Sequence, residues 1–238
     1  MSSFANTIKA ILIKDLVSEL RAKQTLPAMI MLGVLIAWIF RITTEGAAVE
    51  ISVTGAAVLL VSLVFSAILA SEKIFAIEQQ NDCMGSLLLA PIDAGDIYIG
   101  KLLVNITLLC IFEIVTVPVV LVLFKISAGV NWLGFVSILM LVNIGVSAIG
   151  TLLGCAVQGT KAAGSLLSIL VMAALCPMMI PAVFALILLF GATEAGTSGT
   201  LGMVGNLRAA AGFLAACDAI FVTVSWLLFG FVVGEWEK

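Results

Sequence analysis

Histidine is absent from this chain of 238 residues, and several patterns that mark catalytic sites are absent with it. Without histidine the chain lacks the usual general base and the commonest protein ligand for metals and haem. Gly100 and Lys101 are followed by Leu102 rather than by Ser or Thr, so they form no nucleotide-binding phosphate loop. We therefore expect no enzymatic activity from this chain alone. Any energy for its work comes from an ion gradient or from a separate subunit.

Charged residues are scarce, at 11% of the chain, whereas 63% of the residues are hydrophobic. A soluble domain is usually about half apolar and about a quarter charged. A water-soluble core cannot bury this excess of apolar side chains, so we expect the chain to form one domain in a lipid bilayer. Nothing in the sequence indicates nucleic acid as a partner.

Cysteine occurs five times without the CxxC spacing of metal and redox sites. Four of the five lie inside apolar runs, where cysteine behaves as a small hydrophobic residue. We therefore expect structural roles, and no metal or cofactor bound by this chain, for Cys83, Cys110, Cys155, Cys176 and Cys217.

Six apolar segments are long enough to cross the roughly 30 Å hydrocarbon layer as helices. They comprise residues 26–42, 51–70, 102–124, 132–157, 166–190 and 209–233. The second segment is expected to continue as a helix beyond the membrane surface. The sequence thus predicts an all-α integral membrane protein, with a six-helix transmembrane domain over residues 26–238.

Positive charge is unevenly divided between the two ends of these spans. With the N-terminus in the cytoplasm, the cytoplasmic side holds Lys9, Lys14, Arg21, Lys23, Lys73, Lys101, Lys161 and Lys238, and the opposite side holds Arg41, Lys125 and Arg208. Cytoplasmic loops of membrane proteins carry an excess of Lys and Arg. We therefore expect both termini and the polar loop 78–101 in the cytoplasm, and the loop 191–208 on the periplasmic side.

The first 25 residues contain an element of a different kind. Over residues 12–21, one helical face would be apolar, with Leu12, Ile13, Leu16, Val17 and Leu20, and the other polar, with Lys14, Asp15, Ser18 and Arg21. This pattern predicts an amphipathic helix in the membrane interface. Two roles stay open for it: a simple anchor, or a connecting helix that docks a cytoplasmic partner.

Two acidic residues lie inside predicted spans, where a charge costs on the order of 3 kcal/mol on insertion scales. Glu113, near the middle of the third span, is either a pathway or gating residue or the partner of a polar neighbour such as Asn105, Thr116 or Asn143. Asp218, nearer the outer half of the sixth span, is expected to pair with a residue on another helix or at a subunit interface.

Glycine and proline mark further features of the spans. Residues 150–154 and residues 230–234 each begin and end with glycine, a spacing that lets helices approach closely within one subunit or across a dimer seam. Pro177 and Pro181 predict a kink in the fifth span.

The loop 78–101 contains a run of leucines that is unusual for a solvated loop. Asp82 can start a short helix and Pro91 can end it, and Asp93 can cap the approach to the third span. This helix either inserts into a groove on a partner or lies on the bilayer. We predict an ATPase-coupling site formed by Asp82, Cys83, Met84, Gly85, Leu87, Leu88, Leu89, Pro91 and Asp93.

The segment NDCMGSLLLAPIDAGDIYIGKLL resembles the signature of the haem exporter B (CcmB) family of cytochrome c maturation. The matching residues are Gly85, Leu87, Pro91, Asp93, Tyr98, Gly100, Lys101 and Leu102. The basic N-terminus and SAIGTLLG at residues 147–154 extend the similarity to nearly the whole chain. The region before Pro177 departs from the family because it lacks the usual prolines.

This resemblance implies the permease subunit of an ABC complex, with the fold of ABC-2 type exporters, in the bacterial inner membrane. The partners it implies are a separate ATPase subunit, CcmA, which binds ATP, a second copy of this chain, CcmC, the small CcmD and the haem chaperone CcmE. The expected mechanism is mechanical, because closure of the ATPase pair would move the 82–93 helix. This movement either exports haem as cargo or releases haem-loaded CcmE, and the absence of histidine favours release.

Two other functions stay compatible with the sequence. One is an ABC-2 type permease for a different lipophilic substrate, such as a lipid or a drug. The other is an ion-coupled carrier or a purely structural membrane subunit. Co-purification of an ATPase and the identity of neighbouring genes would separate these alternatives.

Overall fold

The computed structural model describes residues 2–46, 50–80, 94–126, 131–157, 163–190 and 207–234, and within these ranges it contains helices and no strand. The helices are α1 (Ser2–Ala22), α2 (Thr25–Thr43), α3 (Ile51–Gln80), α5 (Ala94–Leu123), α6 (Trp132–Ala156), α7 (Ala163–Leu189) and α8 (Leu207–Gly234). All helices except α1 are long and apolar enough to cross a membrane, which confirms the six predicted spans.

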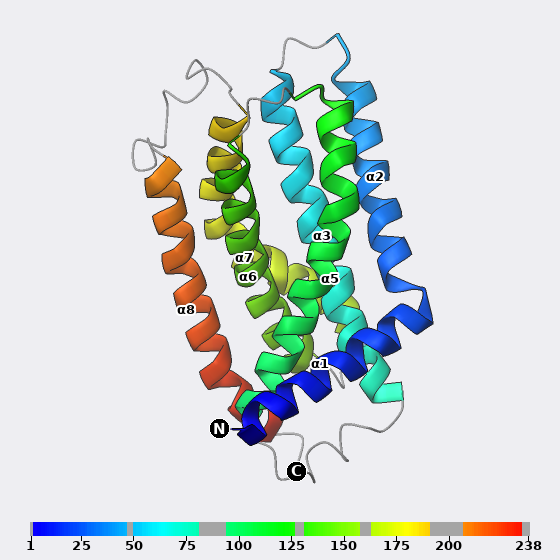
Figure 1. Ribbon diagram of the computed structural model, residues 1–238, viewed down its shortest axis with the longest axis vertical. Helices are drawn as coiled ribbons and strands as arrows, with labels where there is room; N and C mark the ends of the chain where they lie inside the picture. Colours follow the sequence, from blue (N-terminus) through cyan, green and yellow to red (C-terminus); the bar gives the residue numbers. More distant parts are fainter. Residues whose placement is uncertain are drawn as a thin grey trace.

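The six long helices run side by side as a bundle, and α1 crosses one end of it (Figure 1). The end that α1 crosses also holds the C-terminal end of α3 and the N-terminal end of α5. Among the described residues, Lys73 and Lys101 lie toward this end, whereas Arg41, Lys125 and Arg208 belong to the opposite one. The unequal division of positive charge in the sequence therefore corresponds to the two ends of the bundle.

Helices α3 and α6 lie at the centre of the bundle. Within the most apolar 18-residue stretch of each helix, 72% of the α3 stretch and 61% of the α6 stretch is buried. The corresponding share is 22% for α2 and 17% for α8. The large apolar side chains exposed on the outer helices include Trp38 and Phe231. Because lipid tails are as apolar as these side chains, the outer faces of α2 and α8 are suited to lipid contact.

Small residues let the helices approach one another within the chain. A Cβ atom at Gly150 of α6 would collide with Ser71 of α3, so this glycine serves packing inside the subunit, as one of the two alternatives predicted. A Cβ atom at Gly33 of α2 would lie 2.8 Å from the Phe112 ring of α5. Gly230 of α8, by contrast, has no atom within 4 Å of the place where its Cβ would stand.

Two helix boundaries differ from the prediction. α1 begins at Ser2 instead of residue 12, and α5 begins at Ala94 instead of residue 102, whereas α3 continues to Gln80 beyond its apolar part as predicted. A helix outside the hydrocarbon layer does not need an apolar sequence, and Asp96 in the first turn of α5 favours helix initiation there. The predicted loop 78–101 therefore contains helical residues at both ends.

The placement of Asp15 on an outward polar face of α1 was wrong. Ile11, Asp15 and Glu19 follow one another at intervals of four residues, and this face is turned toward the bundle. Ile13 and Val17, which were predicted on the apolar face, are 48% and 42% exposed. The inward face of α1 thus combines apolar and acidic side chains, because an opposite charge on α5 compensates Asp15.

Three prolines lie beyond the first turn of a spanning helix, Pro118 in α5 and Pro177 and Pro181 in α7, whereas Pro27 lies in the first turn of α2. The helices continue through all three positions. Neighbouring helices and local adjustments can satisfy the freed backbone groups in a membrane. The kink in α7 stays a prediction.

Candidate functional site

The predicted coupling residues lie outside the described part of the chain, so their role stays a prediction; they are Asp82, Cys83, Met84, Gly85, Leu87, Leu88, Leu89, Pro91 and Asp93. The elements on both sides of them are described. α3 ends at Gln80, and α5 begins at Ala94. We call residues 82–93, which contain the predicted coupling residues, the coupling segment, and residues 95–101 of α5 the α5 base, since they form the first turns of helix after it.

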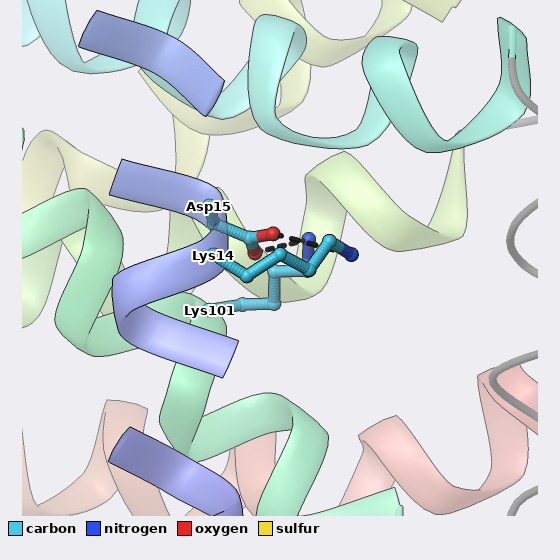
Figure 2. A network of polar contacts seen from close by, with 3 residues as sticks. All are labelled: Lys14, Asp15 and Lys101. Carbon is cyan, nitrogen blue, oxygen red and sulfur yellow. Dashed lines mark hydrogen bonds and ion pairs between the residues drawn. The ribbon is translucent and has the colours of Figure 1, made fainter. Parts of the chain in front are cut away.

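An ion pair joins the α5 base to α1. The Nζ atom of Lys101 donates to Oδ2 of Asp15 over 2.7 Å, and the Lys101 side chain is 1% exposed. Figure 2 shows the Asp15 carboxylate facing the amino groups of both Lys101 and Lys14. The Nζ atom of Lys14 lies 3.4 Å from Oδ1 of Asp15. Lys14 is largely exposed, so its pair with Asp15 contributes little, and the buried pair with Lys101 is the stronger link.

Close backbone approach strengthens the same contact. A Cβ atom at Gly100 would lie 2.9 Å from Cγ2 of Ile11, a separation too short for unstrained carbon atoms. Ile11 is a β-branched residue with few alternative rotamers, so it could not easily move aside. Gly100 is therefore required for α1 to pack at this distance, next to the ion pair.

The remaining side of the α5 base contacts α6 and α8. Tyr98 is fully buried, its hydroxyl group donates to the carbonyl oxygen of Ala148 in α6 over 3.5 Å, and its ring lies 5.4 Å from the Phe229 ring of α8. A Cβ atom at Gly95 would lie 2.6 Å from Nε1 of Trp226 in α8. The α5 base is thus held between α1, α6 and α8.

The sequence contained part of this site. Tyr98, Gly100 and Lys101 were among the residues that carried the family resemblance, but their partners were not predicted. The signal for Asp15 was its position four residues after Ile11, on the face that meets α5. Its pairing with Lys101 joins positions 86 residues apart and could not be found from local patterns.

About two-thirds of the way along α5, Glu113 forms a second polar contact. Asn143 of α6 donates from Nδ2 to Oε2 of Glu113 over 3.0 Å, which confirms one of the three predicted neighbours. The other carboxyl oxygen of Glu113 has no hydrogen-bond partner among the described residues, and neither has the Thr116 hydroxyl group. Glu113 is 7% exposed, so it lies inside the bundle and does not face lipid.

The third predicted neighbour, Asn105, bonds elsewhere. Its Nδ2 atom donates to the Ser71 hydroxyl group of α3 over 2.9 Å, and both residues are buried. Gly150 of α6 leaves the space that this pair occupies. Polar contacts therefore connect α5 with α3 at one level and with α6 at another.

Asp218 of α8 is enclosed by the helices of its own chain. It is 6% exposed, and neither of its carboxyl oxygens has a hydrogen-bond partner among the described residues. A Cβ atom at Gly145 of α6 would collide with Oδ1 of Asp218 and approach Sδ of Met178 in α7. The expected partner on another helix is not found in the described chain, and this burial is inconsistent with an exposed subunit interface.

The α5 helix links these levels mechanically. At about 1.5 Å of rise per residue, Lys101 and Glu113 are separated by about 18 Å along one continuous helix. One continuous helix therefore connects the residues that follow the predicted coupling residues with the level of Glu113 inside the bundle.

Comparison with known proteins identifies the family to which this arrangement belongs. The CcmB protein family matches residues 6–234, and a search of curated proteins found no match. CcmB proteins are bacterial membrane proteins, the non-catalytic permease component of the haem-export ABC system of cytochrome c maturation. Because the match covers nearly all of its residues, the chain belongs to the CcmB protein family.

Proposed function

We propose that this chain converts ATP hydrolysis by a separate ATPase subunit, CcmA, into movement of its transmembrane helices. The coupling segment over residues 82–93 receives the movement, and the α5 base passes it on. The observation that carries this proposal is the buried ion pair between Lys101 and Asp15. It fastens α1 to the first turns of α5, so that both helices move together when the coupling segment moves.

The arrangement of the elements supports this role for α1. α1 crosses the end of the bundle at which the coupling segment leaves α3 and enters α5 (Figure 1). A simple membrane anchor does not need a buried ion pair with a spanning helix. We therefore propose that residues 1–25 are a connecting helix attached to the six-helix domain of residues 26–238, as in ABC-2 type exporters.

We propose that the movement releases haem-loaded CcmE from a neighbouring subunit. The chain has no histidine, so it offers no imidazole as an axial ligand for haem along a transport path. Direct haem export would need Met, Tyr, Cys or apolar contacts instead. In both cases, haem is the cargo of the system and is not a resident cofactor of this chain.

The assembly that we propose contains two copies of this chain, because a pair of ATPases requires two permease subunits, together with CcmC and CcmD. We place it in the bacterial inner membrane with both termini in the cytoplasm. The position of Lys73 and Lys101 toward the end crossed by α1 supports this orientation.

The decisive experiment replaces Leu88 in the coupling segment of the complete complex. Leu88→Asp puts a charge on the predicted docking surface, and Leu88→Met is the control because it conserves apolar character and volume. We expect Leu88→Asp to abolish cytochrome c maturation and to uncouple the ATPase, and Leu88→Met to behave like the parent. Normal assembly and maturation with Leu88→Asp would disprove the coupling role of this segment.

The same complex distinguishes release from export. After ATP is added, haem-loaded CcmE is measured in the released and the complex-bound fractions. Release of preloaded CcmE on ATP addition, without haem crossing the membrane, supports the proposal. The opposite outcome is that preloaded CcmE stays bound and that haem appears on the periplasmic side of sealed vesicles when ATP is added. That outcome would contradict release and support direct export.

A further inference from the structure

Asp218 is a buried acid that the coupling mechanism does not use. Its carboxyl group lies where α8 packs on α6 and α7, and both its Oδ1 atom and the thioether sulfur of Met178 lie close to the place that a Cβ atom at Gly145 would take. Met178 is fully buried, and Asp218 is 6% exposed. Both carboxyl oxygens are without a hydrogen-bond donor within the ranges that the structure describes.

The helices around Asp218 provide no positive charge. No Lys, Arg, Asp or Glu occurs in α6 or α7. α5, which also packs on α8, has Lys101 as its single basic residue, and Lys101 is bound to Asp15. Arg208 of α8 itself is exposed and lies ten positions away, about 15 Å along the helix.

The other titratable groups near this site are acidic. Cys217 is adjacent in the sequence, and its thiol is a weak acid that cannot act as a counter-ion. Glu113 approaches α6 at Asn143, two positions from Gly145 and thus on the other side of that helix. The surroundings of Asp218 therefore oppose a negative charge on its carboxyl group.

An ionised carboxyl group in hydrocarbon, without a charge partner or a hydrogen bond, is strongly unfavourable. A basic side chain of another subunit cannot reach Asp218 through the helices that cover it. A metal cation would require several oxygen ligands, whereas one carboxylate and one thioether converge here. A proton is the one cation that neutralises the group without additional ligands or space.

We propose that Asp218 is a proton-binding site, neutral while α8 is packed against α6 and α7. Loss of this proton requires the carboxyl group to meet water or a positive charge. It therefore requires α8 to separate from Gly145 and Met178. Binding and release of one proton at Asp218 are coupled in this way to the position of α8, whatever cargo the complex serves.

Infrared difference spectroscopy of the complete complex in lipid vesicles tests the proposal. Near neutral pH, we expect the parent spectrum to contain the C=O stretching band of a neutral carboxylic acid, and this band to be lost with Asp218→Asn. Asn has the shape of the neutral acid, so the variant is expected to assemble. Glu113→Gln is the matched control, because it removes the other buried acid of the spans and leaves the Asp218 band in place.

A second measurement on the parent complex does not depend on a variant. Supplying aspartate with a heavy carboxyl carbon shifts the bands of aspartate and leaves those of glutamate unchanged. The expected result is a shifted neutral-acid band that also responds to exchange into heavy water. If labelling shifts bands of ionised carboxylates only, Asp218 is charged at rest and the proposal is wrong.

Discussion

Helix α5 has a buried ionisable side chain at each of two levels, and the two side chains have different partners. At the α5 base, Lys101 meets the opposite charge of Asp15 at 2.7 Å. Further along α5, Glu113 receives one hydrogen bond from the neutral side chain of Asn143 and has one carboxyl oxygen without a partner in the described chain. The first contact joins α5 to α1, and the second joins it to the central helix α6.

The difference indicates what each level is suited to do. A compensated ion pair with close backbone packing resists separation, because parting the helices would leave two charges in a poorly solvated place. A single hydrogen bond to a neutral donor contributes about 1 kcal/mol and can be exchanged at small cost. The α5 base is therefore a fastening point, whereas the level of Glu113 can rearrange when the helices move.

Removal of the Lys101 charge should have the largest effect. Lys101→Met leaves Asp15 without its main partner, and we expect a loss of about 3–5 kcal/mol in the free energy of unfolding. Thermal unfolding of the complex measures this loss, and limited proteolysis should show faster cleavage within α1. Lys73→Met is the control, because Lys73 is exposed toward the same end of the bundle.

A double variant separates the pair from the general effect of mutation. Asp15→Asn combined with Lys101→Met removes both charges, and it should recover at least half of the loss caused by Lys101→Met alone. If the loss in the double variant equals the sum of the losses in Asp15→Asn and Lys101→Met, the two side chains do not interact. The α5 base would then not be held by an ion pair, and it would not differ in this way from the level of Glu113.

Gly100→Ala should have the next largest effect. The new methyl group would meet Cγ2 of Ile11, and we expect a loss of about 1–3 kcal/mol from overpacking. Gly230→Ala is the matched control, since it adds the same group to a helix where no atom lies within 4 Å. That control should be neutral or stabilising by up to about 1 kcal/mol, because alanine favours helix more than glycine. Equal effects would show that Gly100 does not set the distance between α1 and α5.

An effect no larger than that of Gly100→Ala is expected at the level of Glu113. Asn143→Ala removes the amide donor to Glu113, and about 1–3 kcal/mol should be lost if the carboxyl group stays buried. Glu113→Gln keeps an oxygen that accepts from Asn143, and its stability should stay within about 1 kcal/mol of the parent. Cytochrome c maturation is measured for both variants. Full maturation with Glu113→Gln would exclude a role for the Glu113 charge in the mechanism.

The smallest effect concerns Tyr98 in the α5 base. Tyr98→Phe removes a hydroxyl group whose bond to the Ala148 carbonyl oxygen is long, at 3.5 Å, and keeps the ring next to Phe229. We expect a loss of about 0.5 kcal/mol, at the lower limit for a hydrogen bond. A loss as large as that of Lys101→Met would show that this hydroxyl group, and not the ion pair, holds the base together.

The spans could be predicted because the bilayer imposes a minimum length of apolar sequence on each one. The extent of α1 and the start of α5 could not, because residues 2–11 and 94–101 are helical without such a run. In particular, the acidic residues around position 95 indicate a helix cap as readily as a first turn. Residues of this part of α5 instead make tertiary contacts, such as Gly95 with Trp226, that local sequence does not reveal.

The candidate site was predicted in part. The depth of Glu113 in its span follows from counting residues, but the choice of Asn143 over Asn105 depends on which helices face each other. Asp15 was placed on the wrong face, because a local pattern assigns charged side chains to water. Only a distant residue, Lys101, makes the inward orientation favourable.

The ion pair between Asp15 and Lys101 has a consequence for the order in which the protein assembles during synthesis. The ribosome makes Asp15 86 residues before Lys101, so α1 exists for some time without the partner that holds it in place. In the orientation that we propose, the free charge of Lys101 helps to retain its end of α5 in the cytoplasm during membrane insertion. Only afterwards can the same charge be buried against Asp15. The first helix to be made thus completes its contact with α5 only after α2, α3 and the first turns of α5 have been made.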